Sequence, residues 1–229
     1  MNNKYFLIAI IITACLLTVS IIPENPFSGM NWAVFSVIMI GLALFAFFRR
    51  FEKSAVSSKE IALIATMASL AAILRVPFAI VSGLQPTTFL VMLSGYVFGA
   101  QSGFMVGALA ALVSNFFLGQ GPWTPWQMFC WGMCGAAAAF LGRRSDGFKP
   151  VSFAILGGVC GYLFGWVMNI WHWVGFIYPL TWKTFLATYG VSIPFDTLHA
   201  LGNVIFSIVF GKSIYHILIR FKKKINTEA

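Results

Sequence analysis

Hydrophobic residues occur in long, nearly continuous runs along the chain, separated by short polar or glycine- and proline-containing segments. A helix needs about 20 apolar residues to cross a lipid bilayer. Eight runs meet this requirement and predict membrane-spanning helices over residues 5–22, 31–48, 60–76, 84–100, 102–118, 125–142, 151–170 and 193–218. The runs do not alternate with polar positions as the strands of a transmembrane barrel do. The sequence therefore predicts an all-α, polytopic membrane protein.

The polar segment of residues 49–59 divides the predicted helices into two groups. We expect an N-terminal transmembrane hairpin over residues 1–48, a cytoplasmic linker over 49–59, and a six-helix substrate-binding bundle over 60–229. Residues 5–22 are interpreted as a retained helix, with a cleaved signal peptide as the alternative. Residues 170–192, rich in Trp and Tyr, are predicted to form a long external loop.

Charge placement predicts the orientation of the helices. The chain is 59% hydrophobic and 9% charged, with a net charge of +9. Its basic residues cluster beside the apolar runs, near residues 49–59, 143–149 and 212–224. Cytoplasmic loops of membrane proteins are enriched in Lys and Arg, and basic segments also attract anionic lipid. We therefore expect both termini in the cytoplasm, only Arg75 and Lys183 outside among the basic residues, and no nucleic-acid partner.

Polar residues within the apolar runs point to one end of the bundle. Asp196, His199 and Asn203 share a face of the last predicted helix by their spacing. The same reasoning groups Trp166, Asn169 and Trp173 on one helix and Gln127 with Trp131 on another. In the predicted topology all of these lie towards the extracytoplasmic ends, where they form either a binding site or a hydrogen-bond network that stabilises the bundle.

The loop "NFFLGQGPWTPWQMF", residues 115–129, joins two apolar runs at that same end. It carries amide side chains and tryptophans, where a bare turn needs only Gly and Pro. We interpret it as part of the wall and lid of a binding pocket. The full set of candidate substrate-binding residues is Arg75, Gln85, Asn115, Gln120, Trp123, Trp126, Gln127, Trp131, Trp166, Asn169, Trp173, Lys183, Asp196, His199 and Asn203.

The sequence lacks the common enzyme signatures: it has no HExxH, no GxSxG, no nucleotide-binding P-loop and no acidic cluster suited to a metal. We predict neither catalytic residues nor a cofactor of its own. With no nucleotide site, active transport would need energy from another subunit. A stand-alone carrier and an intramembrane enzyme are the competing classes.

Residues 60–218 resemble the substrate-binding S component of energy-coupling factor (ECF) vitamin transporters. The resemblance rests on "GLQPTTFLVMLSGYVFGAQSGFMVGALAALVSNFFLGQGPWTPWQMFCWG" (83–132) and on "PFDTLHALGNVIFSIVFG" (194–211). The N-terminal hairpin departs from the usual six-helix pattern of that family.

The resemblance implies a bacterial plasma-membrane protein that captures a vitamin from outside. It also implies partners: a transmembrane coupling subunit and two cytoplasmic ATPases, which hydrolyse the ATP. The family's Ala-x-x-x-Ala coupling motif maps onto Ala68 and Ala72, for which packing inside the bundle is the alternative. Cobalamin is the first candidate substrate, with riboflavin, pantothenate or a queuosine precursor as alternatives. Arg75 and Lys183 are placed either to attract a carboxylate or phosphate or to anchor at the membrane interface.

Overall fold

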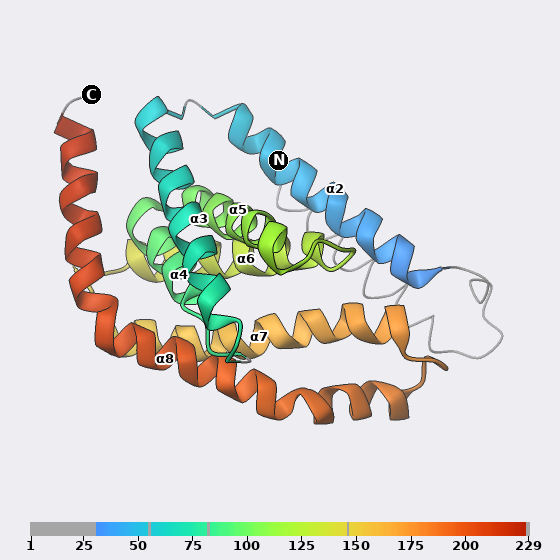
Figure 1. Ribbon diagram of the computed structural model, residues 1–229. Coiled ribbons are helices and arrows are strands. Elements are labelled where there is room, and N and C mark those ends of the chain that lie inside the picture. Colours follow the sequence, from blue (N-terminus) through green and yellow to red (C-terminus); the bar gives the residue numbers. More distant parts are fainter. Residues whose placement is uncertain (1–30, 55, 82, 146, 228–229) are drawn as a thin grey trace.

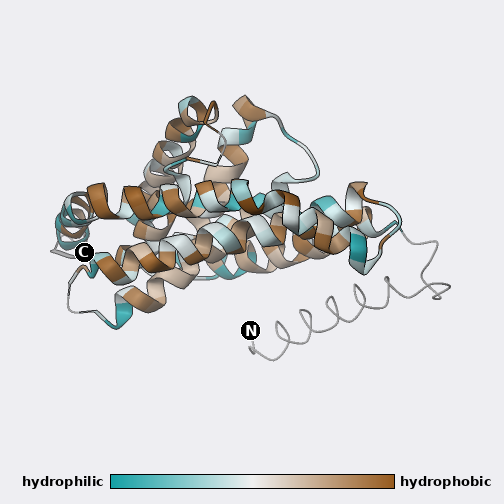
Figure 2. Cartoon of the chain, turned by 90° about the horizontal axis from the view of Figure 1, so that it is seen from below, coloured by the Kyte–Doolittle hydropathy of each residue, from teal (hydrophilic) through white to brown (hydrophobic). Residues whose placement is uncertain are grey.

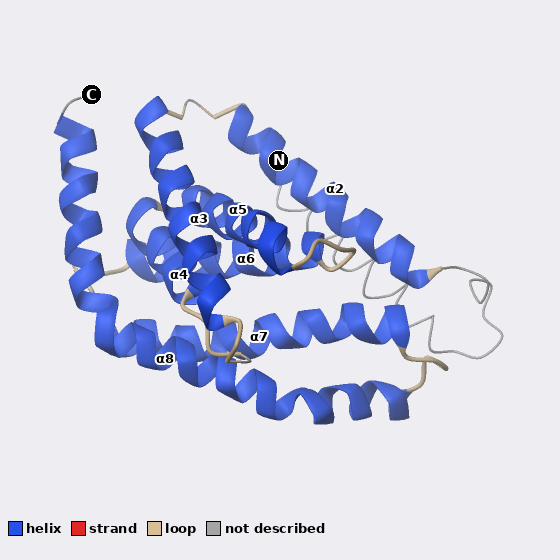
Figure 3. Ribbon diagram, viewed as in Figure 1, coloured by secondary structure: helices blue, strands red, loops and turns tan. Residues whose placement is uncertain are grey.

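The computed structural model describes residues 31–227 except 55, 82 and 146, and within this part the chain forms helices and loops without strands (Figures 1 and 3). The predicted helix over residues 5–22 lies outside the described residues. The described helices are α2 (Trp32–Glu52), α3 (Ser58–Phe78), α4 (Thr87–Phe98), α5 (Ala100–Leu118), α6 (Thr124–Arg143), α7 (Pro150–Phe176) and α8 (Trp182–Thr227). The all-α prediction is confirmed.

Side-chain caps define the ends of the first two helices. The Asn31 side chain accepts a hydrogen bond from the Val34 amide at the start of α2, and Ser57 accepts one from the Glu60 amide at the start of α3. Such caps satisfy backbone amides that have no partner within the helix. The linker between the two helices is shorter than the predicted 49–59, because α2 continues to Glu52 and α3 begins at Ser58.

Helix α4 forms the centre of the bundle, and every residue from Thr87 to Val97 is buried. It packs against α3, α5, α6, α7 and α8. At 12 residues it is shorter than the predicted 84–100 helix, and shorter than the roughly 20 residues of a full span. The predicted boundary at Gln101, between the 84–100 and 102–118 helices, was wrong: the break lies at Gly99, whose φ of 102° suits glycine.

Glycines let α4, α5 and α6 approach one another closely. A Cβ atom at Gly95 would collide with the carbonyl group of Gly135, and one at Gly135 would collide with the backbone of Gly103. Gly103 of α5 therefore packs inside the protein, against α4 and α6. On α7, a Cβ atom at Gly161 would collide with Ala200 of α8, so this glycine lets α7 and α8 approach closely.

The predicted external loop over residues 170–192 was wrong. Helix α7 continues to Phe176 and α8 begins at Trp182, so the intervening non-helical segment is short. The new helix start has a physical cause, because Thr181 and Thr184 each accept a hydrogen bond from the other's backbone amide. This reciprocal arrangement resembles a capping box. The two long helices lie side by side over much of their length (Figure 1).

The outward faces of the helices are apolar, as a lipid environment requires. Five described helices are long and apolar enough to cross a membrane: α2, α3, α5, α7 and the Trp182–Lys224 part of α8. Large side chains such as Phe116, Phe117 and Val191 are exposed on the outside. Hydrophobic residues run along most of the helices in Figure 2, and hydrophilic ones gather mainly towards ends and turns.

The bundle has two chemically different ends. One, which we call the Arg75 end, contains Arg75, the loop from Ala79 to Pro86 and the loop from Gly119 to Trp123. The other, the basic end, contains the turn at Gly99, the loop after Arg143 and the C-terminal part of α8. Because α4 and α6 run the full distance between them, the two ends lie on opposite sides of the buried core.

Candidate functional site

Arg75 is the central residue of a buried polar network. Its side chain, on the last turns of α3, is only 7% exposed. The guanidinium donates from Nε to Gln85 Oε1 at 3.2 Å and from Nη1 to Ser114 Oγ at 2.6 Å and Asn115 Oδ1 at 2.7 Å. It also lies over the Trp131 ring, with Cζ 4.6 Å from the ring centroid. These contacts join α3, α5 and α6 through one positive charge.

The interactions of Arg75 offset an energetic cost. An arginine at the centre of a membrane helix costs about 2.5–3.5 kcal/mol on insertion scales. Hydrogen bonds to a charged group contribute about 1.5–3 kcal/mol each, and a cation–π contact about 0.5–2 kcal/mol. All of its described partners are neutral, so hydrogen bonds and the indole face stabilise the cation without an ion pair.

Asn115 extends the network into α6 and the neighbouring loop. Its Nδ2 donates to Gln127 Oε1 at 2.7 Å and to Thr124 Oγ1 at 3.0 Å. Thr124 donates in turn to Gln120 Oε1, and Gln120 Nε2 donates to the Leu112 carbonyl. The amides predicted from the loop sequence are therefore brought together, and they hold residues 119–123 against the end of α5.

A second chain of contacts connects α6, α4 and α8. Trp131 Nε1 donates to Thr88 Oγ1 at 2.9 Å, and this hydroxyl lies 2.8 Å from His199 Nε2. The Phe164 ring packs against both Trp131 and His199, with centroid distances of 4.7 Å and 5.1 Å. Trp131 thus contacts Arg75 with its face and Thr88 with its N–H, which joins the two sets of contacts.

Asp196 belongs to a separate group between α7 and α8. Ser192 donates to Asp196 Oδ2 at 2.8 Å and accepts from Asn169 Nδ2 at 2.6 Å. A Cβ atom at Gly165 would collide with the Asp196 carboxyl group, so the glycine provides the space for this buried acid. Asn169 and Asp196, which the sequence placed on different helices, are thus connected indirectly through Ser192.

The tryptophans predicted for the site have different surroundings. The Trp123 ring lies edge-on to Trp171, with centroids 6.0 Å apart, and connects the loop before α6 to α7. Trp126 is buried, whereas Trp166 is exposed on α7. Trp173 packs with Trp32 and Val174 in a small second core and donates to Thr184, so its contacts are structural.

Some predicted residues lie apart from the network. Lys183 is exposed in the first turn of α8. Asn203 Nδ2 donates to the Gly157 carbonyl oxygen at 3.1 Å and so connects α8 to α7. Ala68 and Ala72 are 2% and 1% exposed, on the buried face of α3. Both alanines pack inside the bundle, which is the alternative that the sequence left open, and their role in coupling stays a prediction.

The structure also brings in residues that the sequence reasoning missed. Thr88, Ser114, Thr124 and Ser192 each bond directly to a predicted site residue. The sequence pattern that identified the amides also applies to these four residues, because each is a polar residue within or beside an apolar run. Hydroxyls are common in membrane helices, where they often bond to their own backbone, so their participation needed the tertiary contacts.

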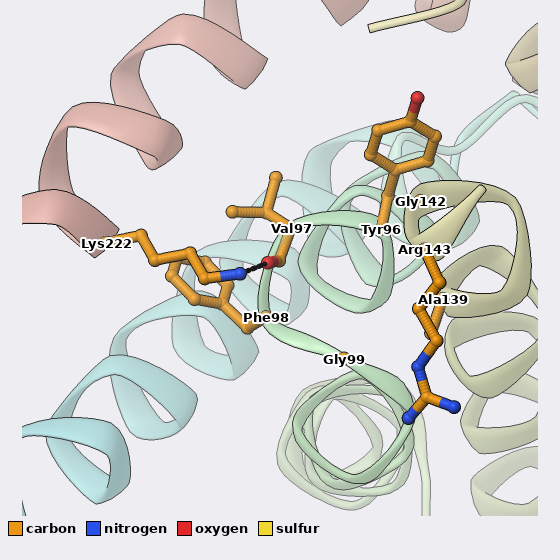
Figure 4. Close-up of a pocket in the computed structure, with 8 residues that line it drawn as sticks. All are labelled: Tyr96, Val97, Phe98, Gly99, Ala139, Gly142, Arg143 and Lys222. Carbon is orange, nitrogen blue, oxygen red and sulfur yellow. Dashed lines mark hydrogen bonds between the residues drawn. The ribbon is translucent and has the colours of Figure 1, made fainter. Parts of the chain in front are cut away.

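A hollow of about 300 Å³ lies at the basic end. It is lined by the last turns of α4 and α6, with Gly99 between α4 and α5, and by Lys222 from α8 (Figure 4). Lys222 donates to the Val97 carbonyl at 2.6 Å, and this places its charge at the C-terminus of α4. Arg143 extends away from Lys222 in Figure 4. The contact of Lys222 satisfies a helix end, which is a structural role.

The fold and the polar network together define a class: a multi-pass helical membrane protein with polar side chains collected at one end of its bundle. The profile of the family described as ECF transporter, substrate-specific component, matches residues 59–221. The chain therefore belongs to this family of transporter subunits, and the match begins at the start of α3, after the predicted N-terminal hairpin. Searches of curated proteins and of solved structures gave no match.

Proposed function

We propose that this protein is the vitamin-binding subunit of an ECF importer and that it binds its ligand at the Arg75 end. Its membership of the substrate-specific components supports the role of substrate-binding subunit. The main observation that supports the location is the convergence of polar side chains there from α3, α4, α5, α6 and α8.

Unsatisfied groups at this end give the proposal a second support. Within the described residues, three side-chain atoms are buried without a hydrogen-bond partner: Asn203 Oδ1 on α8, and, at this end, Thr87 Oγ1 and Trp126 Nε1. Thr87 and Trp126 lie at the starts of α4 and α6, beside the loops of the Arg75 end. Buried polar groups in proteins nearly always have partners, and a bound ligand with polar edges would supply them.

The proposed transport cycle needs partners. A coupling subunit in the membrane and two cytoplasmic ATPases would supply the energy, with ATP hydrolysed by those ATPases. The protein would take up its ligand from outside the bacterial plasma membrane, with both termini in the cytoplasm, as the basic clusters favour. Cobalamin is the first substrate to test, followed by pantothenate, riboflavin and a queuosine precursor.

Native mass spectrometry of the full-length protein, purified in mild detergent, tests this proposal. We expect a bound small molecule whose mass identifies the vitamin, and we expect ATPase subunits in affinity purifications from the native membrane. Vitamin uptake by the protein alone in proteoliposomes, without ATPases, would contradict the proposal and favour a stand-alone carrier.

A further inference from the structure

The positive charge of Arg75 has no negative partner in the described part of the chain. The carboxylates described are Glu52, Glu60 and Asp196. Glu60 accepts from Ser102 and Glu52 pairs with Arg49, both at the basic end. Asp196 accepts from Ser192 and forms no ion pair with Arg75. The guanidinium is therefore held by neutral oxygens and an indole ring only.

This arrangement leaves part of the guanidinium available. Nε and Nη1 make the three hydrogen bonds given above, whereas Nη2 makes none to any described residue. A mostly buried arginine, 7% exposed, therefore has two N–H groups that make no hydrogen bond to the described residues.

The partners of Arg75 also fix its orientation. Gln85, Ser114 and Asn115 hold one edge of the planar group, and the Trp131 ring covers one face at 4.6 Å. Buried charges in proteins are usually paired or coordinated, and the rigid fork of arginine matches carboxylate and phosphate oxygens. A preorganised and unpaired guanidinium is the arrangement expected of an anion receptor.

We propose that Arg75 binds an anionic group, a carboxylate or a phosphate, on the transported ligand and thereby selects ligands that carry one. The inference rests on the proposed function, because it assigns a ligand chemistry to the same site. It separates the candidate substrates. Cobalamin contains a phosphodiester and pantothenate a carboxylate, whereas riboflavin and queuosine-precursor bases contain neither.

Matched ligand pairs test the inference on the full-length protein in nanodiscs. Cobalamin is compared with cobinamide, which lacks the phosphodiester, and pantothenate is compared with panthenol, in which an alcohol replaces the carboxylate. Riboflavin is the neutral reference. We expect the protein to bind the anionic member of one pair at least tenfold more tightly than its counterpart, and the pair that responds distinguishes phosphate from carboxylate.

Variants then assign the preference to Arg75. In Arg75→Gln the affinity ratio within the responding pair should fall towards one, and Arg75→Lys should keep part of it because the charge remains. Arg143→Gln removes an exposed guanidinium at the basic end and should keep the wild-type ratio. A purely structural role for Arg75 would weaken binding of both members equally, leave the ratio unchanged and overturn the inference.

The vitamin affinities of the wild-type protein provide a second test of the inference, which does not depend on whether the variants fold. Tight binding of riboflavin, of cobinamide as tightly as cobalamin, or of panthenol as tightly as pantothenate would overturn the anion inference while leaving the vitamin-binding function in place. Failure of the wild-type protein to bind or retain any vitamin would count against the proposed function itself.

Discussion

The two ends of the bundle use their polar side chains differently. At the Arg75 end, Arg75, Asn115 and Gln127 bond to other side chains, and some donors there keep unused capacity. At the basic end, Ser102 donates to Glu60, but Lys222 and Tyr96 donate to the Val97 and Gly147 carbonyls and so close a helix end and a loop. Side chains that bond to one another can exchange partners for a ligand, whereas those that complete backbone hydrogen bonding stabilise the fold.

The first prediction tests which side of the membrane each end faces, and its outcome is all-or-none. Pro122 is exposed in the loop before α6, and Ser58 is exposed at the start of α3. In intact cells, Pro122→Cys should react with a membrane-impermeant maleimide, whereas Ser58→Cys should react only after permeabilisation. The parent protein provides the background from its own four cysteines, of which Cys130, Cys134 and Cys160 are buried and Cys15 lies outside the described residues. The reverse pattern would place the Arg75 end in the cytoplasm and contradict uptake from outside.

The second prediction concerns the two faces of α3 and has a large expected effect on stability. Ala68→Leu with Ala72→Leu adds volume to a packed interior, where such changes cost about 1–3 kcal/mol each. The double variant should therefore unfold at lower temperature and lose ligand binding. Ala65 and Ser69 are exposed on the other face of the same helix, so Ala65→Leu with Ser69→Leu should keep both stability and binding.

Uptake assays then separate packing from coupling. If another subunit docks on the exposed face, the Ala65 and Ser69 double variant should bind the vitamin normally and lose ATP-dependent uptake. If the Ala68 and Ala72 double variant is stable and binds the vitamin, the buried face of α3 tolerates larger side chains. If that variant also loses uptake, the result supports the coupling role predicted for the pair.

The third prediction tests the aromatic part of the Arg75 end. Stacking of a ring on an aromatic side chain contributes about 1–3 kcal/mol in nucleic-acid binders, and a factor of ten in affinity corresponds to about 1.4 kcal/mol. Trp123→Ala should weaken vitamin binding roughly tenfold to a hundredfold in isothermal titration. Trp182, an exposed ring at the start of α8, provides the matched control, and Trp182→Ala should bind as the wild type does. Equal effects of the two substitutions would remove Trp123 from the site.

The smallest expected effect is at the basic end. Lys222→Met removes the 2.6 Å hydrogen bond to the Val97 carbonyl but keeps an apolar stem of similar length. A hydrogen bond of this kind contributes about 0.5–1.5 kcal/mol, or up to about 3 kcal/mol with a charged donor. We expect a fall of a few degrees in the thermal midpoint, no change for Lys212→Met, and unchanged vitamin affinity in both. A large loss of affinity in Lys222→Met would show that the two ends are not independent.

The sequence by itself determined the class of protein and the location of its polar residues. Long apolar runs predict membrane helices because lipid offers no partners for backbone groups. Polar residues inside such runs are expensive, so Arg75, Asn115, Gln127 and His199 stand out as candidates without a structure. Periodicity also predicted correctly that Gln127 and Trp131 share a face of α6, because helical spacing is a local property.

Only the tertiary structure decided which of these residues meet. Spacing within one helix cannot show that Arg75 of α3 bonds to Ser114 and Asn115 of α5, or that Thr88 of α4 lies between Trp131 and His199. It also could not show which face of α3 is buried, because alanines occur on both faces and hydrophobicity does not separate a lipid-facing side from a packed one. Composition suggested a loop at residues 170–192, whereas the threonine cap at Thr181 and Thr184 and the packing of α7 on α8 make most of it helical. These outcomes depend on contacts between distant segments, which the order of residues along one helix does not contain.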